Sequence, residues 1–193
     1  MTKIEIIPYI ERWPEEFQEI AGAIRQSADG LAVRIDHIGS TSVPGLPAKN
    51  VIDVQVTVAS LDSPEVIVKA LSALGYLYLE HITQDHVPSG ANASPEEWQK
   101  LFFRSSAGQR RANVHIRVAG KSNQRYAILF RDYLRANRLA ADGYAEIKRQ
   151  LARYHPDDED AYYDIKDPVC DIIMAGAECW ATVNDWQLGS FDA

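Results

Sequence analysis

Hydrophobic residues recur along the first part of the chain with two different spacings, which alternate. Helical spacing occurs over 14–28 and again over 64–74, with a proline at the start of each segment. Runs of β-branched and alternating apolar residues predict strands over 32–38, 51–58, 76–82, 100–104 and 112–118. A helix, two strands, a second helix and three strands predict an α+β fold, in which helices pack on one side of a mixed sheet.

From Ser122 onward only helical spacing remains. Three apolar stripes, over 126–134, 144–154 and 169–180, predict three helices. We expect one domain over 1–193, with a sheet core at about 1–121 and a C-terminal helical part at about 122–185.

Local signals set further expectations for this helical part. The acidic run 157–160 predicts the start of the last helix, because carboxylates stabilise a helix N-terminus; metal binding by the run is the alternative. Asp167-Pro168 predicts a break or restart in that helix, because proline lacks the amide hydrogen. The tail 186–193 is expected to be loosely held.

Composition and charge exclude several classes of protein. The net charge of −7 and a pI near 5.2 argue against binding of extended nucleic acid. Cys170 and Cys179 fit neither a metal motif nor a disulfide framework and indicate a reducing compartment. There is no signal-peptide pattern and no apolar run of transmembrane length, so we expect a cytoplasmic protein without a membrane partner.

Positive charge is concentrated in one segment. Nine basic residues and a single acid lie between Arg104 and Arg138, which gives that segment a net charge of +8. A local basic surface on an acidic protein suits a small anion such as a polyphosphate. The alternative is a set of exposed basic faces; Arg131 and Arg135, one helical turn apart, would then point to solvent.

The candidate chemistry is concentrated between two apolar runs, in a loop rich in Gly, Pro, Ser and Thr. Gly39-Ser40 opens the loop, where the missing glycine side chain allows backbone N–H groups to approach phosphate oxygens. Asp53 lies in the second apolar run, as a metal ligand or general base would. The alternative is a plain connection that uses Gly and Pro for turn geometry.

Two histidines and a lysine extend this candidate site. His37 and His115 each lie in an apolar strand, where a histidine is either a catalytic group or a structural residue with a satisfied partner. Lys49, just before the second strand, either reaches a phosphate or is a surface turn residue.

Residues 37–53, HIGSTSVPGLPAKNVID, resemble the signature of the GrpB family of bacterial proteins. The likeness continues at 113–116 (NVHI), 130–135 (FRDYLR) and 163–166 (YDIK), and so covers nearly the whole chain. Members of this family are in some cases fused to a coenzyme A biosynthetic kinase.

The resemblance implies a fold similar to nucleotidyltransferases of the polymerase-β type. Gly39 and Ser40 match the turn that holds a triphosphate, and Asp53 matches the first carboxylate of a site for Mg²⁺ or Mn²⁺. The second and third carboxylate positions are occupied by Gln55 and His115. Magnesium prefers oxygen ligands, so this set is expected to hold two such ions poorly.

Two functions follow as hypotheses. The first is a transferase that moves a nucleotidyl or phosphoryl group to a small acceptor, with Asp53 as metal ligand and His115 as metal ligand or general base. The second is a non-catalytic module that binds a nucleotide or phosphometabolite at a degenerate metal site. The residues expected to bind phosphate or nucleotide in either case are His37, Gly39, Ser40, Thr41, Lys49, Arg110, Arg111 and Lys166. A third, weaker hypothesis is a protein-interaction domain that keeps only the fold.

Overall fold

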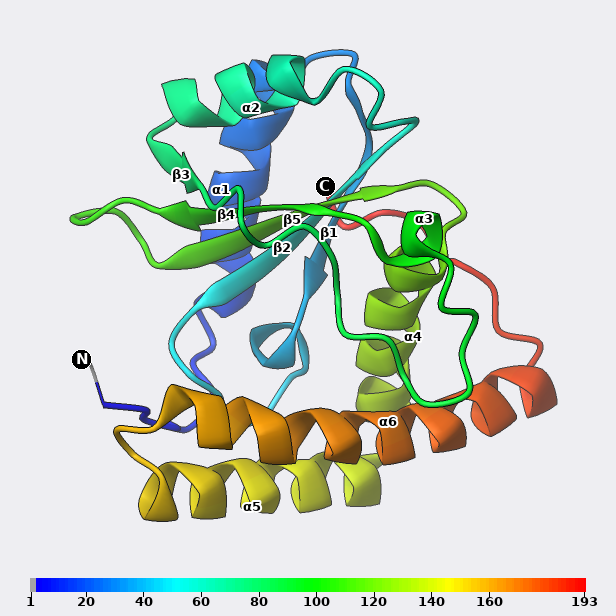
Figure 1. Cartoon of the computed structure of the whole chain (residues 1–193). Helices are drawn as coiled ribbons and strands as arrows, with labels where there is room; N and C mark the ends of the chain where they lie inside the picture. Colours follow the sequence, from blue (N-terminus) through cyan, green and yellow to red (C-terminus); the bar gives the residue numbers. More distant parts are fainter. Residues whose placement is uncertain (1–2) are drawn as a thin grey trace.

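A computed structural model describes residues 3–193 and has a five-stranded sheet at its centre (Figure 1). The strand order is β1-β2-β5-β4-β3. The strands are β1 Ala32–Ile38, β2 Ile52–Val58, β3 Tyr76–Tyr78, β4 Leu101–Ser105 and β5 Ala112–Val118. The central pair, β2 and β5, is parallel and the other pairs are antiparallel. The predicted α+β fold with a mixed sheet is confirmed.

One face of the sheet carries the main hydrophobic core. Helices α1 (Trp13–Ser27) and α2 (Pro64–Ala73) cover this face. Trp13, Phe17 and Leu71 from these helices are buried in one cluster with alternate residues of β2 and β5. Burial of each such large apolar side chain stabilises the fold by about 1.5–3 kcal/mol.

The opposite face of the central strands is polar. Successive side chains of a strand point to opposite faces of a sheet, so the alternation that buries the apolar residues places a second set on this face. The set comprises Asp53 and Gln55 on β2, and Asn113, His115 and Arg117 on β5. The parallel register pairs Asp53 with Asn113 and Gln55 with His115.

Three helices form the remainder of the molecule. They are α4 Ser122–Ala136, α5 Arg138–Tyr154 and α6 Glu159–Val183. Helix α4 extends away from the sheet, and α5 and α6 lie side by side at its far end (Figure 1). The polar face of the sheet therefore looks towards these helices, whereas α1 and α2 occupy the other side.

Helix α6 corrects one prediction and confirms another. The predicted break at Asp167-Pro168 is wrong, because the helix continues through Pro168 for a total of 25 residues. Met174 and Ala177, beyond the proline, stay buried in one cluster with residues of α4, and this packing outweighs the lost hydrogen bond. The acidic run does begin the helix: the carboxylate of Asp158 accepts a hydrogen bond from the Ala161 N–H at 2.9 Å.

The connection between β3 and β4 also differs from the prediction. The strand expected over 76–82 ends at Tyr78, because a turn closed by Ile82 N–H and the Leu79 carbonyl leads the chain away from the sheet. The long loop that follows contains a short helix, α3, Pro95–Trp98.

The tail is docked and not loosely held as expected. The N–H groups of Asp192 and Ala193 donate to the Ile35 carbonyl on the edge strand β1. The Asp192 carboxylate accepts hydrogen bonds from His37 N–H at 2.9 Å and from Arg131 at 2.6 Å. Arg131 is consequently only 4 % exposed, which rules out for this residue the alternative in which it points to solvent.

Candidate functional site

A cavity of about 850 Å³ lies between the polar face of the sheet and the helices α4, α5 and α6. Its walls come from β2, β5, the turn after β1, the loop before β4 and all three helices. A volume of this size is typical of a site for a small molecule.

The turn after β1 forms one wall of the cavity. Gly39 adopts a positive φ of 69°, and a single 3-10 turn, η1 (Ser40–Ser42), follows it. The hydroxyl of Ser42 donates to the Gly39 carbonyl at 2.6 Å and fixes the turn. Among residues 3–193, the backbone N–H groups of Ser40 and Thr41 have no hydrogen-bond partner, so these donors remain available to an acceptor.

Asp53 and His115 lie together on the cavity wall. The carboxylate of Asp53 accepts a hydrogen bond from the Asn113 amide at 2.8 Å, and His115 Nε2 lies 3.9 Å from Asp53 Oδ1. Burial, together with the positive charge of Arg117, lowers the pKa of His115 to about 4. Burial opposes ionisation of Asp53, but His115 and Asn113 outweigh it and hold the pKa of this carboxyl below its ordinary value. At neutral pH the pair is thus a neutral imidazole beside a carboxylate.

A second acid, half-buried, faces the cavity from the loop before β4. The Asp85 carboxylate accepts a bidentate pair of hydrogen bonds from Arg117, with both N–O distances 2.8 Å. It accepts a further hydrogen bond from Lys100 at 2.7 Å. Asn123 donates to it at 3.0 Å. Although burial opposes ionisation, Arg117 and Lys100 hold the pKa of the Asp85 carboxyl well below its ordinary range. Sequence reasoning missed Asp85, since a lone acid in a polar loop carries no signal.

These contacts decide how well the cavity suits a pair of divalent metals. Both oxygens of Asp85 are engaged by cations, and Gln55 Oε1 accepts a hydrogen bond from Arg117 at 2.6 Å. Of the residues that the structure describes, Asp53 is the cavity carboxylate that lies on the sheet, and it accepts a hydrogen bond from the neutral amide of Asn113. Within residues 3–193 no group of three or more His, Cys, Asp or Glu side chains is arranged to hold a metal. The donors do not fit a two-metal site.

Lys148 on α5 is a cavity residue that the sequence analysis missed. Its Nζ lies 2.8 Å from Ser40 Oγ and donates to the Pro47 carbonyl at 2.6 Å. Burial, with smaller contributions from the charges of Lys166, Arg149 and Lys49, lowers its pKa to about 7 against the opposing effect of Cys170. A signal was present: Lys148 comes one turn after Tyr144, on the apolar stripe that packs α5 into the molecule.

Two more lysines stand beside it. Lys49 Nζ donates to the Tyr163 hydroxyl at 2.7 Å and lies 4.6 Å from the centre of that ring. Lys166 lies 5.4 Å from the same ring centre and pairs with Asp167. We call Lys49, Lys148 and Lys166 the lysine cluster; it is assembled from three separate segments of the chain.

Aromatic side chains line much of the rest of the cavity. They are Trp98, Phe102, Tyr126, Phe130, Tyr144, Tyr162 and Tyr163. The pairs Tyr126–Phe130 and Phe130–Tyr144 have centroid distances of 6.2 and 5.6 Å. The cavity therefore combines cationic groups with flat apolar surfaces.

The structure places the other predicted residues in different surroundings. Arg111 lines the cavity and is exposed. Arg110 points elsewhere, to Glu16 at 2.7 Å and to Asn50. His37 stacks on Phe17 with a centroid distance of 4.7 Å, and burial lowers its pKa to about 3.

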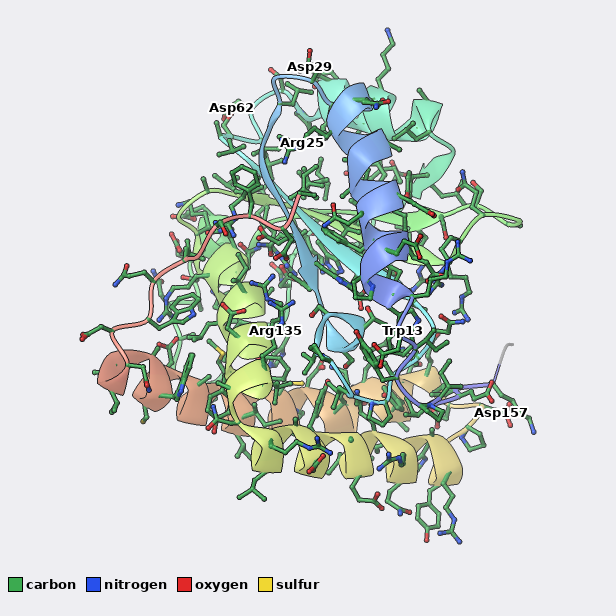
Figure 2. All side chains as sticks on the ribbon, turned by 180° about the vertical axis from the view of Figure 1, so that it is seen from behind. Trp13, Arg25, Asp29, Asp62, Arg135 and Asp157 are labelled. Atoms are coloured by element: carbon green, nitrogen blue, oxygen red, sulfur yellow. The ribbon has the colours of Figure 1, made fainter. Side chains whose placement is uncertain are left out.

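Thr41 and Arg135 show how this region is held in place. The Thr41 hydroxyl lies 3.0 Å from His37 Nε2 and is buried. Arg135 donates to the Ser42 carbonyl at 3.0 and 2.8 Å, and Figure 2 shows it on α4 near the turn. The basic segment is thus largely neutralised by internal contacts; within residues 3–193, Arg104 and Arg111 at the cavity are the members that form no ion pair.

The sequence matches the family described as GrpB protein over residues 3–175. The chain belongs to the GrpB family. A crystal structure of the conserved protein GrpB from Enterococcus faecalis is 30 % identical, with a TM-score of 0.75 over 91 % of this chain and 99 % of that chain.

Curated relatives of this GrpB family member carry two kinds of name. A dephospho-CoA kinase of Mycolicibacterium paratuberculosis is 36 % identical over 95 % of this chain, which spans 48 % of that protein. The UPF0157 protein PA4798 of Pseudomonas aeruginosa is 34 % identical over 91 % of this chain and 68 % of the relative. The chain thus spans about half the length of the kinase-named relatives. Among residues 3–193, none of the helices has the length and apolarity needed to cross a membrane.

Proposed function

We propose that this protein binds a phosphorylated small molecule of the nucleotide class in the cavity between the sheet and the C-terminal helices. The observation that carries the proposal is the lysine cluster. Lys49, Lys148 and Lys166 line the same cavity, and Lys148 contacts Ser40 Oγ. Within residues 3–193, Lys166 is the one of the three with a carboxylate partner. Like charges gathered in a partly buried site repel one another, and a bound polyanion relieves that repulsion.

The turn and the aromatic walls support the same ligand class. Ser40 and Thr41 offer backbone N–H groups next to the cluster, and such donors suit phosphate oxygens. Phe102, Tyr126 and Phe130 offer flat surfaces for a planar ring. A ligand with a charged end for the lysine cluster and a flat apolar end for the aromatic side chains would fit the cavity.

Transfer of a nucleotidyl or phosphoryl group is the second candidate, favoured by the Asp53–His115 pair. An ionised carboxylate beside a neutral imidazole on a cavity wall can accept a proton from a substrate hydroxyl. A single Mg²⁺ or Mn²⁺ ion on Asp53 stays a prediction. The kinase name of the mycobacterial relative refers to a longer protein and supports only a phosphorylated ligand.

Isothermal titration calorimetry with ATP, ADP, adenosine and pyrophosphate tests the binding proposal. We expect the phosphorylated compounds to bind and adenosine alone to bind much more weakly. Lys49→Ala and Lys166→Ala should each weaken pyrophosphate binding by about 10-fold, the equivalent of one charge-assisted hydrogen bond. Lys69→Ala, an exposed lysine on α2, is the matched control and should leave the affinity unchanged.

The outcomes of this titration separate the hypotheses. Failure of all phosphorylated compounds to bind at millimolar concentration would remove the proposed function. Repeating the titration with EDTA and with Mg²⁺, on the wild type and on Asp53→Asn, separates a metal-dependent site from a metal-free one. Release of pyrophosphate or phosphate that depends on Asp53 would favour the transferase over the binding module.

A further inference from the structure

The Lys148 amine lies within hydrogen-bond distance of the Ser40 hydroxyl, as a general base lies beside the nucleophile that it activates. We propose that Ser40 is a nucleophile towards phosphorus and that Lys148 is its general base. The inference rests on the proposed function, since it takes the phosphorylated ligand of the same cavity as the natural electrophile. It adds a covalent step at Ser40, which binding of a phosphorylated ligand alone would not require.

The contact between the two side chains is short and oriented. Lys148 Nζ lies 2.8 Å from Ser40 Oγ, and the bond to the Pro47 carbonyl at 2.6 Å holds the amine in place. The protonated amine donates to both oxygens. The neutral amine keeps the bond to Pro47 and accepts the Ser40 hydroxyl proton in its lone pair. Both protonation states therefore fit the same geometry, as general-base catalysis requires.

The other cavity serines are different. Ser105 accepts a hydrogen bond from the Ala112 N–H at 3.0 Å. Ser106 donates to the Gly75 carbonyl. These contacts stabilise turns and strand ends. Of the serines that line the cavity in the described part of the chain, Ser40 is the one bonded to a lysine amine.

The surroundings of Lys148 make the neutral amine accessible near neutral pH. Its side chain is 3 % exposed, and burial is the largest of the effects that lower its pKa to about 7. The titratable and charged groups around it are Tyr144 and Arg149 on its own helix, Lys49 before β2, and Lys166 and Cys170 on α6. Two of the nearby cations, Lys49 and Lys166, belong to the lysine cluster and disfavour a third positive charge.

The same surroundings would stabilise the charge that develops during attack. Ser40 is the first residue of η1, and its N–H group and that of Thr41 are without partners in the described part of the chain. Lys49 and Lys166 line the same cavity and add positive charge near Lys148. Donors fixed in place before the reaction are the main source of such stabilisation.

The step balances as a substitution at phosphorus. The Ser40 oxygen forms a bond to the terminal phosphorus of a phosphoanhydride while the bridging P–O bond breaks. The leaving phosphate takes the bonding electron pair, and the hydroxyl proton passes to Lys148 Nζ. The products are phosphoserine at position 40 and the shortened ligand.

Diisopropyl fluorophosphate, a small neutral phosphorus electrophile, tests the nucleophile directly. Attack by Ser40 would form an O–P bond and release fluoride, and peptide mass spectrometry would locate the label. We expect labelling at Ser40 with a rate that rises with pH about a midpoint near pH 7. Lys148→Arg, which keeps the charge but stays protonated, should slow labelling by about 100-fold. Ser40→Ala should abolish it, and Ser105→Ala, a cavity serine without a lysine partner, should react like the wild type.

The results distinguish this inference from the proposed function. Absence of label at Ser40, or an unchanged rate in Lys148→Arg, would overturn the inference even if pyrophosphate binds. Labelling of Ser40 with the expected dependence on Lys148, without pyrophosphate binding, would keep the nucleophile and remove the proposed ligand. If Lys148→Arg does not fold, as judged by circular dichroism, the pH profile of the wild type decides: a rate independent of pH between 5 and 9 would contradict a lysine base.

Discussion

Gly39 lies directly against the side chain of Asp53. A Cβ atom placed on Gly39 would lie 2.9 Å from the Cβ of Asp53, and closer still to its carboxylate. The positive φ of Gly39 and this close approach both require glycine at this position. Because Gly39 has no side chain, the turn that carries Ser40 can pack closely against the strand that carries Asp53.

The first prediction concerns this contact. We expect Gly39→Ala to lower the free energy of unfolding by about 2–4 kcal/mol, because it adds a steric clash to the cost of a positive φ. Gly45→Ala is the matched control, since Gly45 also has a positive φ but no atom within 4 Å of an added Cβ. Urea denaturation should show a smaller loss for Gly45→Ala; equal losses would mean that Asp53 moves aside at little cost.

The second prediction concerns Asp85. We expect Asp85→Asn to lower the free energy of unfolding by about 3–5 kcal/mol, because it leaves the buried charges of Arg117 and Lys100 without a counter-ion. Asp62→Asn, on an exposed loop marked in Figure 2, should change it by less than about 0.5 kcal/mol.

Acid titration gives a second test of Asp85. The folded pKa of this carboxyl lies below the ordinary value of 3.8. Its stabilising contribution is therefore complete above about pH 4 and is lost as the pH falls below that value. Wild-type stability should decline more steeply than that of Asp85→Asn in this range, and parallel curves would contradict the assigned ion pairs.

The third prediction concerns His37. Its pKa is about 3 in the folded chain and 6.5 when unfolded, so the unfolded chain binds an additional proton between these values. The free energy of unfolding should fall as the pH drops below 6.5, by up to about 1.4 kcal/mol per pH unit from this residue. His37→Gln should reduce the slope measured by urea denaturation between pH 6 and pH 4.5 by about that amount. An unchanged slope would mean that His37 becomes protonated inside the fold.

The fourth prediction concerns Pro168. Pro168→Ala should raise the free energy of unfolding by about 1–3 kcal/mol, because it restores a backbone hydrogen bond inside α6. Pro64→Ala is the control, since Pro64 occupies the first position of α2, where no intrahelical bond is lost. A destabilised Pro168→Ala would indicate that α6 needs the proline to pack against α4.

The sequence allowed the order of the elements to be predicted because each strand and helix carries its own apolar spacing. The turn at Gly39-Ser40 followed from its composition, whereas the shared site of Asp53 and His115 was implied by the resemblance to the GrpB family. Apolar spacing and turn composition depend only on residues that are close together in the sequence, so they can be identified before the fold is known.

The missed residues depend on contacts between distant segments. Asp85 becomes significant only when Arg117, 32 positions away, meets it. Lys148 becomes significant only when α5 packs beside Ser40, 108 positions earlier. The docked tail likewise depends on Arg131 and the free edge of β1. The spacing of apolar residues within one segment does not predict contacts between distant segments.

The parallel pairing of β2 with β5 also has a kinetic consequence. Strands β1 and β2, and β4 and β5, are joined by antiparallel pairing between neighbours in sequence. The contact between Asp53 and Asn113, in contrast, joins residues 60 positions apart. We expect the β1–β2 pair and the β4–β5 pair to form early and to join each other late. Closing the longer loop between them costs more conformational entropy before the stabilising contacts form. During refolding, ligand binding should therefore appear only with the slowest phase that restores native structure.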